Sequence, residues 1–166
     1  MAQITGPQKN RGKLKAARAI VICFIFLFSS ACHYEAIKHD PKKAALDTNR
    51  FLKTLYFDEN PSEALKFCDE QVGAAGGADA LTRMINKTKQ DRGQLRSLVA
   101  DSYLMAPGSG IELYYVGTYE KGVLYHRLVV LGDVSAGYKV AGLWFKDDAY
   151  PQTELRLKFE PEIPVQ

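Results

Sequence analysis

The chain is poor in the residues that build disulfide scaffolds, metal centres and long membrane spans. Its 166 residues include three cysteines, three histidines and one tryptophan, and three cysteines are too few for a fold held together by disulfides. The uncharged run that ends at the second cysteine, residues 19–32, has 14 residues. As a helix this stretch rises about 21 Å, which is short of a hydrocarbon core of about 30 Å.

Motifs that mark common catalytic and cofactor sites are also missing. The sequence contains no phosphate-binding loop, no dinucleotide-binding glycine fingerprint, no H-E-x-x-H pair and no paired C-x-x-C. A G-x-S-x-G nucleophile turn is absent too. We therefore expect no metal, no cofactor and no catalytic residue in this protein.

Positive charge is concentrated at the amino terminus. The whole chain has 22 basic and 19 acidic residues, a formal net charge of +3. Residues 1–31 hold five basic residues and no acidic one, so the remainder has 17 basic against 19 acidic residues and a net charge near −2. Because nucleic-acid binding requires a basic surface that displaces counterions from phosphates, we expect no nucleic-acid partner.

The amino terminus has the organisation of a secretory signal peptide. A basic stretch is followed by a short apolar run, then by the small residues Ser29, Ser30 and Ala31, and then by Cys32. This order predicts a signal peptide over residues 1–31. A polar tether over residues 32–40 follows it, and no later segment is apolar enough to span a membrane.

The cysteine directly after the small residues resembles the lipobox of bacterial lipoproteins. That family has a leucine three positions before the cysteine, where this chain has Ser29 and its nearest leucine is Leu27. The resemblance implies that the Cys32 thiol carries a diacylglycerol, that the leader is cut before Cys32, and that the new amine takes a further acyl chain such as palmitate. It also implies anchoring on the periplasmic side of the cell envelope. His33 stands where an aspartate would signal inner-membrane retention, which favours the outer membrane.

Two other interpretations of the leader remain open. Ordinary signal peptidase accepts a small-x-small site, so cleavage after Ala31 could release a soluble periplasmic protein, or the leader could stay as an uncleaved anchor. Cys68 bears on the choice, because its spacing predicts a buried helical position. With Cys32 acylated, Cys68 is a buried free thiol; in the soluble protein the two cysteines could form a disulfide.

The first half of the remaining chain has helical periodicity. Apolar residues recur at helical spacing over residues 42–57, and again over residues 61–72, where Asn60 and Pro61 form a typical helix start. A third helix is predicted from an Asp79 cap to Gly93, with Leu81, Met84, Ile85 and Thr88 on one face.

After Gly93 the apolar period changes from 3.6 to 2, which predicts four antiparallel strands near residues 94–105, 111–120, 123–131 and 138–145. We therefore predict an α+β domain over residues 41–150, with N-terminal helices packed on a curved four-stranded antiparallel sheet. Residues 151–166 form a C-terminal tail that either adds an edge strand at 155–159 or is loose.

The segment from Gly137 to Trp144 is similar to the final strand of small bacterial domains of the nuclear-transport-factor-like, or cystatin-like, superfold. Such domains are often lipoproteins of unknown function. The resemblance implies a curved sheet wrapped on a helical layer, with an apolar pocket on the concave face. Fold likeness alone assigns no function.

A hairpin turn at Lys121 and Gly122 would fix which side chains share a face. This register places Tyr115, Tyr119, His126 and Trp144 together on the concave face, where they form the predicted pocket. The opposite face would carry Tyr114, Leu143 and Phe145, and such an apolar surface predicts contact with an envelope protein or a second copy of the chain.

The function class that these patterns favour is a membrane-tethered envelope lipoprotein that acts as a binding or assembly module without catalysis. The alternative is a small-molecule enzyme that uses the concave pocket. For that alternative, the nearest pair able to move a proton is Asp101 with Tyr115.

Overall fold

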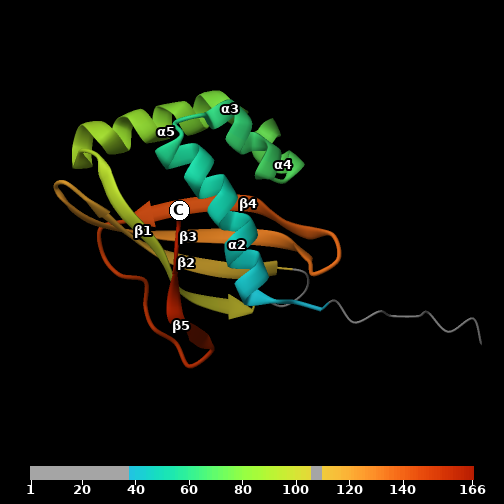
Figure 1. Cartoon of the computed structure of the whole chain (residues 1–166). Helices are drawn as coiled ribbons and strands as arrows, with labels where there is room; N and C mark the ends of the chain where they lie inside the picture. The colour runs from blue at the N-terminus through green and yellow to red at the C-terminus, as the bar shows by residue number, and fades with distance from the viewer. Residues whose placement is uncertain (1–37, 106–109) are drawn as a thin grey trace, which may run out of the picture. The chain divides into compact units, whose positions relative to one another are not determined.

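The computed structural model describes residues 38–105 and 110–166. The predicted signal peptide, the lipid-attachment residue Cys32 and most of the tether lie outside the described residues. The described residues form a helical layer over one face of a curved sheet (Figure 1). We refer to the helix-covered face of the sheet as the inner face and to the opposite face as the outer face.

The sheet is antiparallel throughout and has the strand order β4-β3-β2-β1-β5. The α+β class and the N-terminal position of the helices are therefore confirmed, but the sheet has five strands where four were predicted. The strands are β1 (Leu95–Met105), β2 (Gly110–Tyr119), β3 (Gly122–Asp133), β4 (Gly137–Lys146) and β5 (Arg156–Pro164).

The helical layer consists of several short elements and two longer helices. Asp40 caps the first helix by accepting hydrogen bonds from the backbone N–H groups of Lys42 and Lys43. This helix continues into a π-helical turn, so the prediction over residues 42–57 is confirmed as one helical segment. The elements are α2 (Pro41–Leu52), η1 (Lys53–Phe57), α3 (Pro61–Ala64), η2 (Leu65–Phe67), α4 (Glu70–Ala74) and α5 (Gly77–Arg92).

The second predicted helix is interrupted at Cys68. Asn60 caps α3 as predicted, accepting from the backbone N–H of Glu63. Cys68 is instead extended, with φ −95° and ψ 156°, and forms an isolated parallel bridge with Val140 of β4. Asp69 then starts α4 by accepting from the N–H of Gln71. A long-range contact with the sheet therefore overrides the local helical pattern.

Cys68 is buried, as its spacing predicted, although it does not lie in a helix. It is a free cysteine with 6% of its surface exposed, and burial raises the pKa of its thiol to about 11. A buried thiol of this kind is unreactive and packs as a small apolar group.

The hairpin between β2 and β3 turns one residue earlier than predicted. Tyr119 pairs with Gly122, so Glu120 and Lys121 form the turn, and Tyr115 lies opposite His126. Gly122 has φ 119°, a backbone conformation that glycine adopts easily. The predicted pairs are displaced by two residues, which leaves every side chain on its predicted face.

The last predicted strand changes face part-way along its length. Val130 pairs with Val140, whereas Val129 pairs with Gly142, so Ala141 is an extra residue in a β-bulge. A one-residue insertion reverses the face of every later side chain. Trp144 therefore lies opposite Arg127 on the outer face, and Phe145 lies opposite His126 on the inner face. The predicted placement of Trp144 and Phe145 is wrong for this reason, and so is that of Leu143, which lies opposite Leu128 and packs against the core.

The C-terminal segment is part of the domain. Of the two predictions for this segment, an edge strand or a loose tail, the structure shows the edge strand. β5 pairs with β1 and extends beyond the predicted residues 155–159. Phe159 and Val165 are buried in the core. Because β4 and β5 occupy opposite edges of the sheet, residues 147–155 cross from one edge to the other. Tyr150 of this connection packs on Tyr114 of the outer face, with ring centroids 5.5 Å apart.

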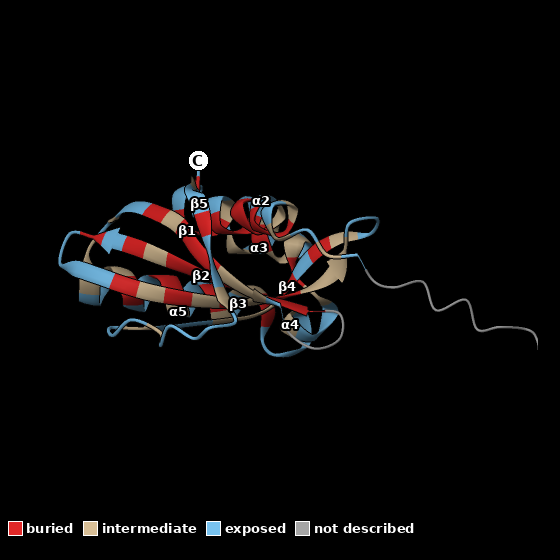
Figure 2. Cartoon of the chain, turned by 90° about the horizontal axis from the view of Figure 1, so that it is seen from below, coloured by how far each residue is buried: buried red, intermediate tan, exposed pale blue. Residues whose placement is uncertain are grey.

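The hydrophobic core lies between the inner face of the sheet and the helices (Figure 2). Buried positions alternate along β3, as expected for a sheet with one covered face. Along β2 the alternation is broken at Tyr114, which is buried on the outer face where Tyr150 packs on it. The helices contribute Phe51, Leu52, Leu55, Leu81 and Ile85 to this core.

Candidate functional site

The four residues of the predicted pocket do not share a site. Tyr115, Tyr119 and His126 are buried on the inner face, whereas Trp144 lies on the outer face with 49% of its surface exposed. Tyr115 donates a hydrogen bond to Oδ1 of Asn49 in α2 at 3.0 Å, which holds the helix against the sheet. Tyr115 is therefore a packing residue with a satisfied hydroxyl group.

Tyr119 and His126 belong to a closed aromatic cluster. The Tyr119 hydroxyl lies 3.4 Å from Nε2 of His126, and the rings of Tyr56 and Phe145 lie 5.7 and 5.9 Å from the His126 ring. Gly117 leaves room for the imidazole, since a Cβ there would lie 2.9 Å from Nε2. The adjoining cavity at Tyr56 and Tyr119 has a volume of about 10 Å³, which is close to the space of one water molecule.

Burial controls the ionisation of this cluster. It lowers the pKa of His126 to about 4, so the imidazole is neutral at physiological pH. Burial also raises the pKa values of Tyr56 and Tyr119, which stay protonated. Nδ1 of His126 is buried and has no hydrogen-bond partner among the described residues. The cluster is packed and neutral, and it offers no space for a substrate.

The acid and tyrosine of the enzyme alternative do not meet. Asp101 is the extra residue of a β-bulge in β1 and forms ion pairs with Arg156 and Lys158 of β5. Burial opposes ionisation of this carboxyl group, but hydrogen bonds from Lys158 and Ser102 outweigh burial and lower the pKa of Asp101. Tyr115 points instead to Asn49, so the two groups cannot exchange a proton directly.

The space that the structure does provide is two adjoining cavities between α5 and β4 that share Met84, and we call them together the α5–β4 groove. One face of α5 lines it along the whole helix, about 22 Å at 1.5 Å per residue. The opposite wall is formed by consecutive residues of β4 and the chain just after it. The apolar end has a volume of about 450 Å³ and is lined by Phe51, Gln71, Val72, Ala75, Gly77, Ala80, Leu81, Met84, Val140, Ala141, Gly142, Leu143 and Trp144.

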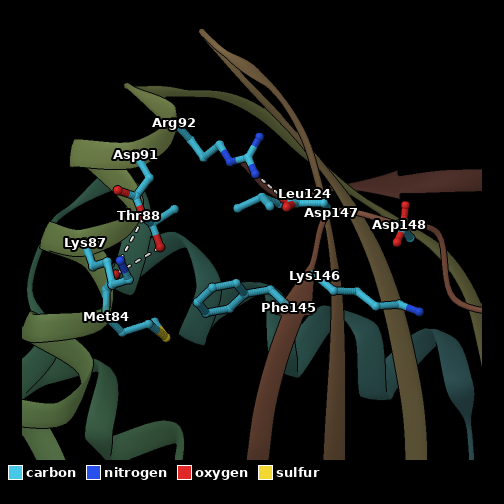
Figure 3. A pocket seen from close by; sticks show the side chains of 10 residues that line it. All are labelled: Met84, Lys87, Thr88, Asp91, Arg92, Leu124, Phe145, Lys146, Asp147 and Asp148. Atoms are coloured by element: carbon cyan, nitrogen blue, oxygen red, sulfur yellow. Dashed lines mark hydrogen bonds and ion pairs between the residues drawn. The ribbon is translucent and has the colours of Figure 1, made fainter.

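The other end of the α5–β4 groove is charged. Figure 3 shows the side chains of α5 facing those of β4 across it, with the Phe145 ring pointing toward the helix. Its volume is about 460 Å³. It is lined by Met84, Lys87, Thr88, Asp91, Arg92, Leu124, Phe145, Lys146, Asp147 and Asp148.

Charges of both signs are present at this end, and most are paired. Arg92 forms an ion pair with Asp147 across the groove, and Lys87 pairs with Asp91 along α5 at 3.0 Å. Lys146 lies 4.4 Å from the centre of the Tyr150 ring. The charged end therefore has little net charge and would favour a polar group over either a strong anion or a strong cation.

Met84 lines both ends and marks the boundary between them. The two walls change from apolar to charged at the same level, α5 after Met84 and β4 after Phe145. The helical pattern placed Met84 on the same face as Leu81, Ile85 and Thr88. The structure buries Leu81 and Ile85 in the core, buries Thr88 at the charged end, and leaves Met84 partly buried between the two ends.

Trp144 closes the outer side of the apolar end. Its ring covers Gly142, where a Cβ would collide with the indole, and the Arg127 guanidinium lies 5.3 Å from the ring centre. Arg127 is held in turn by Glu112, whose pKa is lowered mainly by this hydrogen bond. The indole is therefore positioned on both sides, and it is the only tryptophan in the chain.

No family model, curated protein or solved structure matches the chain. The resemblances to bacterial lipoproteins and to the nuclear-transport-factor-like superfold therefore stay predictions. In the part of the chain that the structure describes, no helix combines the length and the apolarity needed to cross a membrane.

Proposed function

We propose that this protein is an envelope lipoprotein, fixed to a membrane through Cys32, whose domain binds an elongated partner in the α5–β4 groove without catalysis. The anchor part of the proposal is supported by the leader, the small residues before Cys32 and the polar tether. Several acyl chains hold a protein on a membrane far more firmly than one. A tether of nine residues, 32–40, reaches about 30 Å, which keeps the domain near the membrane surface.

The observation that supports binding is that the side chains on both walls of the α5–β4 groove change from apolar to charged along its length. Two walls from distant parts of the sequence change from apolar to charged at the same level. A long groove with partly exposed apolar side chains is unusual on a surface that only meets water, and it typically marks a contact site. The ligand that fits is elongated, with one apolar and one polar end.

Photo-crosslinking at two neighbouring positions of α5 tests this proposal in intact membranes. Lys87 and Asn86 are both exposed and about 100° apart on the helix, and only Lys87 lines the groove. With a photoreactive amino acid at Lys87, we expect a product heavier than the chain itself. The same substitution at Asn86 should give little product.

A second pair of variants shows whether the cross-linked molecule occupies the apolar end. Ala80→Glu places a charge among the groove residues, whereas Ala78→Glu lies on the same helix and outside the lining. Burying that carboxylate should weaken binding about tenfold, so the product at Lys87 should decrease in Ala80→Glu only. Equal cross-linking from Lys87 and Asn86, or none from either, would show that the groove is not the binding site.

A further inference from the structure

We propose that the partner binds the α5–β4 groove as an extended peptide segment that adds to β4 as a new edge strand. This inference rests on the proposed function and names the chemistry of the ligand. Its basis is the juxtaposition of an open strand edge with the apolar groove.

The edge of β4 is open over most of the groove. β4 is an edge strand that pairs with β3, and within residues 38–105 and 110–166 its one further bridge is that between Val140 and Cys68. Among the described residues, positions 141–146 have no strand on their other side. An edge of this kind presents backbone N–H and C=O groups that can pair with another chain.

This open edge faces into the groove. Side chains in a strand alternate between the two faces of the sheet, yet the groove is lined by the consecutive residues Ala141, Gly142 and Leu143, followed by Trp144. Phe145 and Lys146 continue the lining at the charged end. A surface that includes every residue in turn borders the edge of the strand rather than one of its faces.

The chain already uses this edge once. The backbone N–H of Asp69 donates to the carbonyl of Val140 at 2.8 Å, next to the extended residue Cys68. This is a single residue of strand addition, and it lies at the apolar end where the open edge begins. An incoming peptide would continue the pairing from Ala141 toward Lys146.

Proline protects the other edge of the sheet but not the edge at β4. Pro161 and Pro164 lie within β5 and lack the backbone N–H that a neighbouring strand would need. Proline is one of the devices that prevent pairing at sheet edges. β4 contains no proline. Its bulge at Ala141 and its residue Lys146 lie at the two ends of the open edge, so the residues between them can pair with a further strand.

A peptide fits the groove better than an alkyl chain or a second copy of the domain. An alkyl chain over residues 141–146 would cover backbone polar groups without pairing them, which costs free energy. A peptide satisfies those groups and places alternate side chains against Met84 and Phe145 on one side and Trp144 on the other. A strand from a second copy would bring its own sheet against α5, which forms the opposite wall.

The test uses the full chain in lipid nanodiscs and a library of labelled peptides of about six residues, a typical strand length, with apolar residues at alternate positions. Peptides that bind are remade with N-methyl groups on alternate residues, in two complementary sets. In a strand, alternate N–H groups point to opposite sides, so only one set removes the donors that face β4. We expect that set to bind about tenfold more weakly and the other to bind nearly unchanged.

Hydrogen exchange shows where the peptide binds, and the two alanine variants control for binding outside the groove. Binding should slow hydrogen exchange of those amides in residues 141–146 that point away from β3, and it should be lost in Ala80→Glu but kept in Ala78→Glu. Equal binding of both N-methyl sets, or no bound peptide while Lys87 still cross-links, would overturn strand addition and leave the groove as a site for another ligand. Self-association that protects residues 141–146 would assign the edge to a second copy. Absence of both peptide binding and cross-linking would overturn the proposed function as well.

Discussion

Replacing Arg156 with methionine should destabilise the domain by about 3 kcal/mol, because it leaves the buried carboxylate of Asp101 with one cation instead of two. The Arg156 side chain is 8% exposed and that of Asp101 is 10% exposed. The guanidinium also donates to Ser102 at 2.7 Å and to the Tyr150 carbonyl at 2.8 Å, and lies 3.9 Å from the centre of the Tyr114 ring. It joins β5 and the crossing connection to the outer face of the sheet.

Arg127→Met is the matched control on the same face. Arg127 also pairs with an acid, Glu112, and stacks on an aromatic ring, Trp144. Its side chain is 35% exposed, so its ion pair is largely screened by solvent, and its loss should cost about 1 kcal/mol or less.

Urea unfolding of the two variants measures the difference. Adding Asp101→Asn to Arg156→Met removes the uncompensated charge and should recover at least about 1 kcal/mol. A loss from Arg156→Met no larger than that from Arg127→Met would contradict a structural role for the Arg156 cluster. Absence of recovery in the double variant would show that the charge on Asp101 is not the cause.

Acidification from pH 6.5 to pH 4 should remove about 3 kcal/mol of stability through His126 alone. The folded pKa of His126 is about 4 because of burial, and the unfolded value is about 6.5. Within this range the unfolded chain binds more protons than the folded chain. This contribution is therefore complete above pH 6.5 and is lost as the pH falls toward 4. Tyr56 and Tyr119 do not titrate in this range, since their pKa values are raised.

The pH dependence of unfolding in His126→Phe and His126→Gln isolates this effect from the carboxylates. Each variant should lose less stability than the natural chain between pH 6.5 and 4. His126→Phe should stay within about 1 kcal/mol of it at pH 7, because the ring remains and the unpaired Nδ1 is removed. Parallel pH curves for all three proteins would contradict the burial of a neutral imidazole.

The fold class follows from local patterns that act over few residues. The change of apolar period after Gly93, the Asn60 cap and the β-branched and aromatic strands each depend on neighbours along the chain, and the structure contains the elements that they predict. The hairpin error at Gly122 changed pairing but not faces, since two residues are one full period of a strand.

The site could not be predicted because it depends on contacts between distant segments. The one local sign of the bulge at Ala141 is the neighbouring Gly142, and it does not fix the register, yet the bulge moves Trp144 to the outer face and Phe145 to the inner face. The groove needs α5 and β4 to lie side by side, and the aromatic cluster needs Tyr56 from η1. The sequence held one sign of the groove-lining face of α5. Lys87 and Asp91 continue the helical spacing of Ala80 and Met84.

The anchor decides which partners the domain can meet, because a binding domain held at a membrane and a free periplasmic domain have different partners. Mass spectrometry of the native protein purified from membranes measures this directly. We predict a mature chain that begins at Cys32 and carries a diacylglycerol on the thiol and an acyl chain on the amine. A chain that begins at any other residue, or at an unmodified Cys32, would contradict the account.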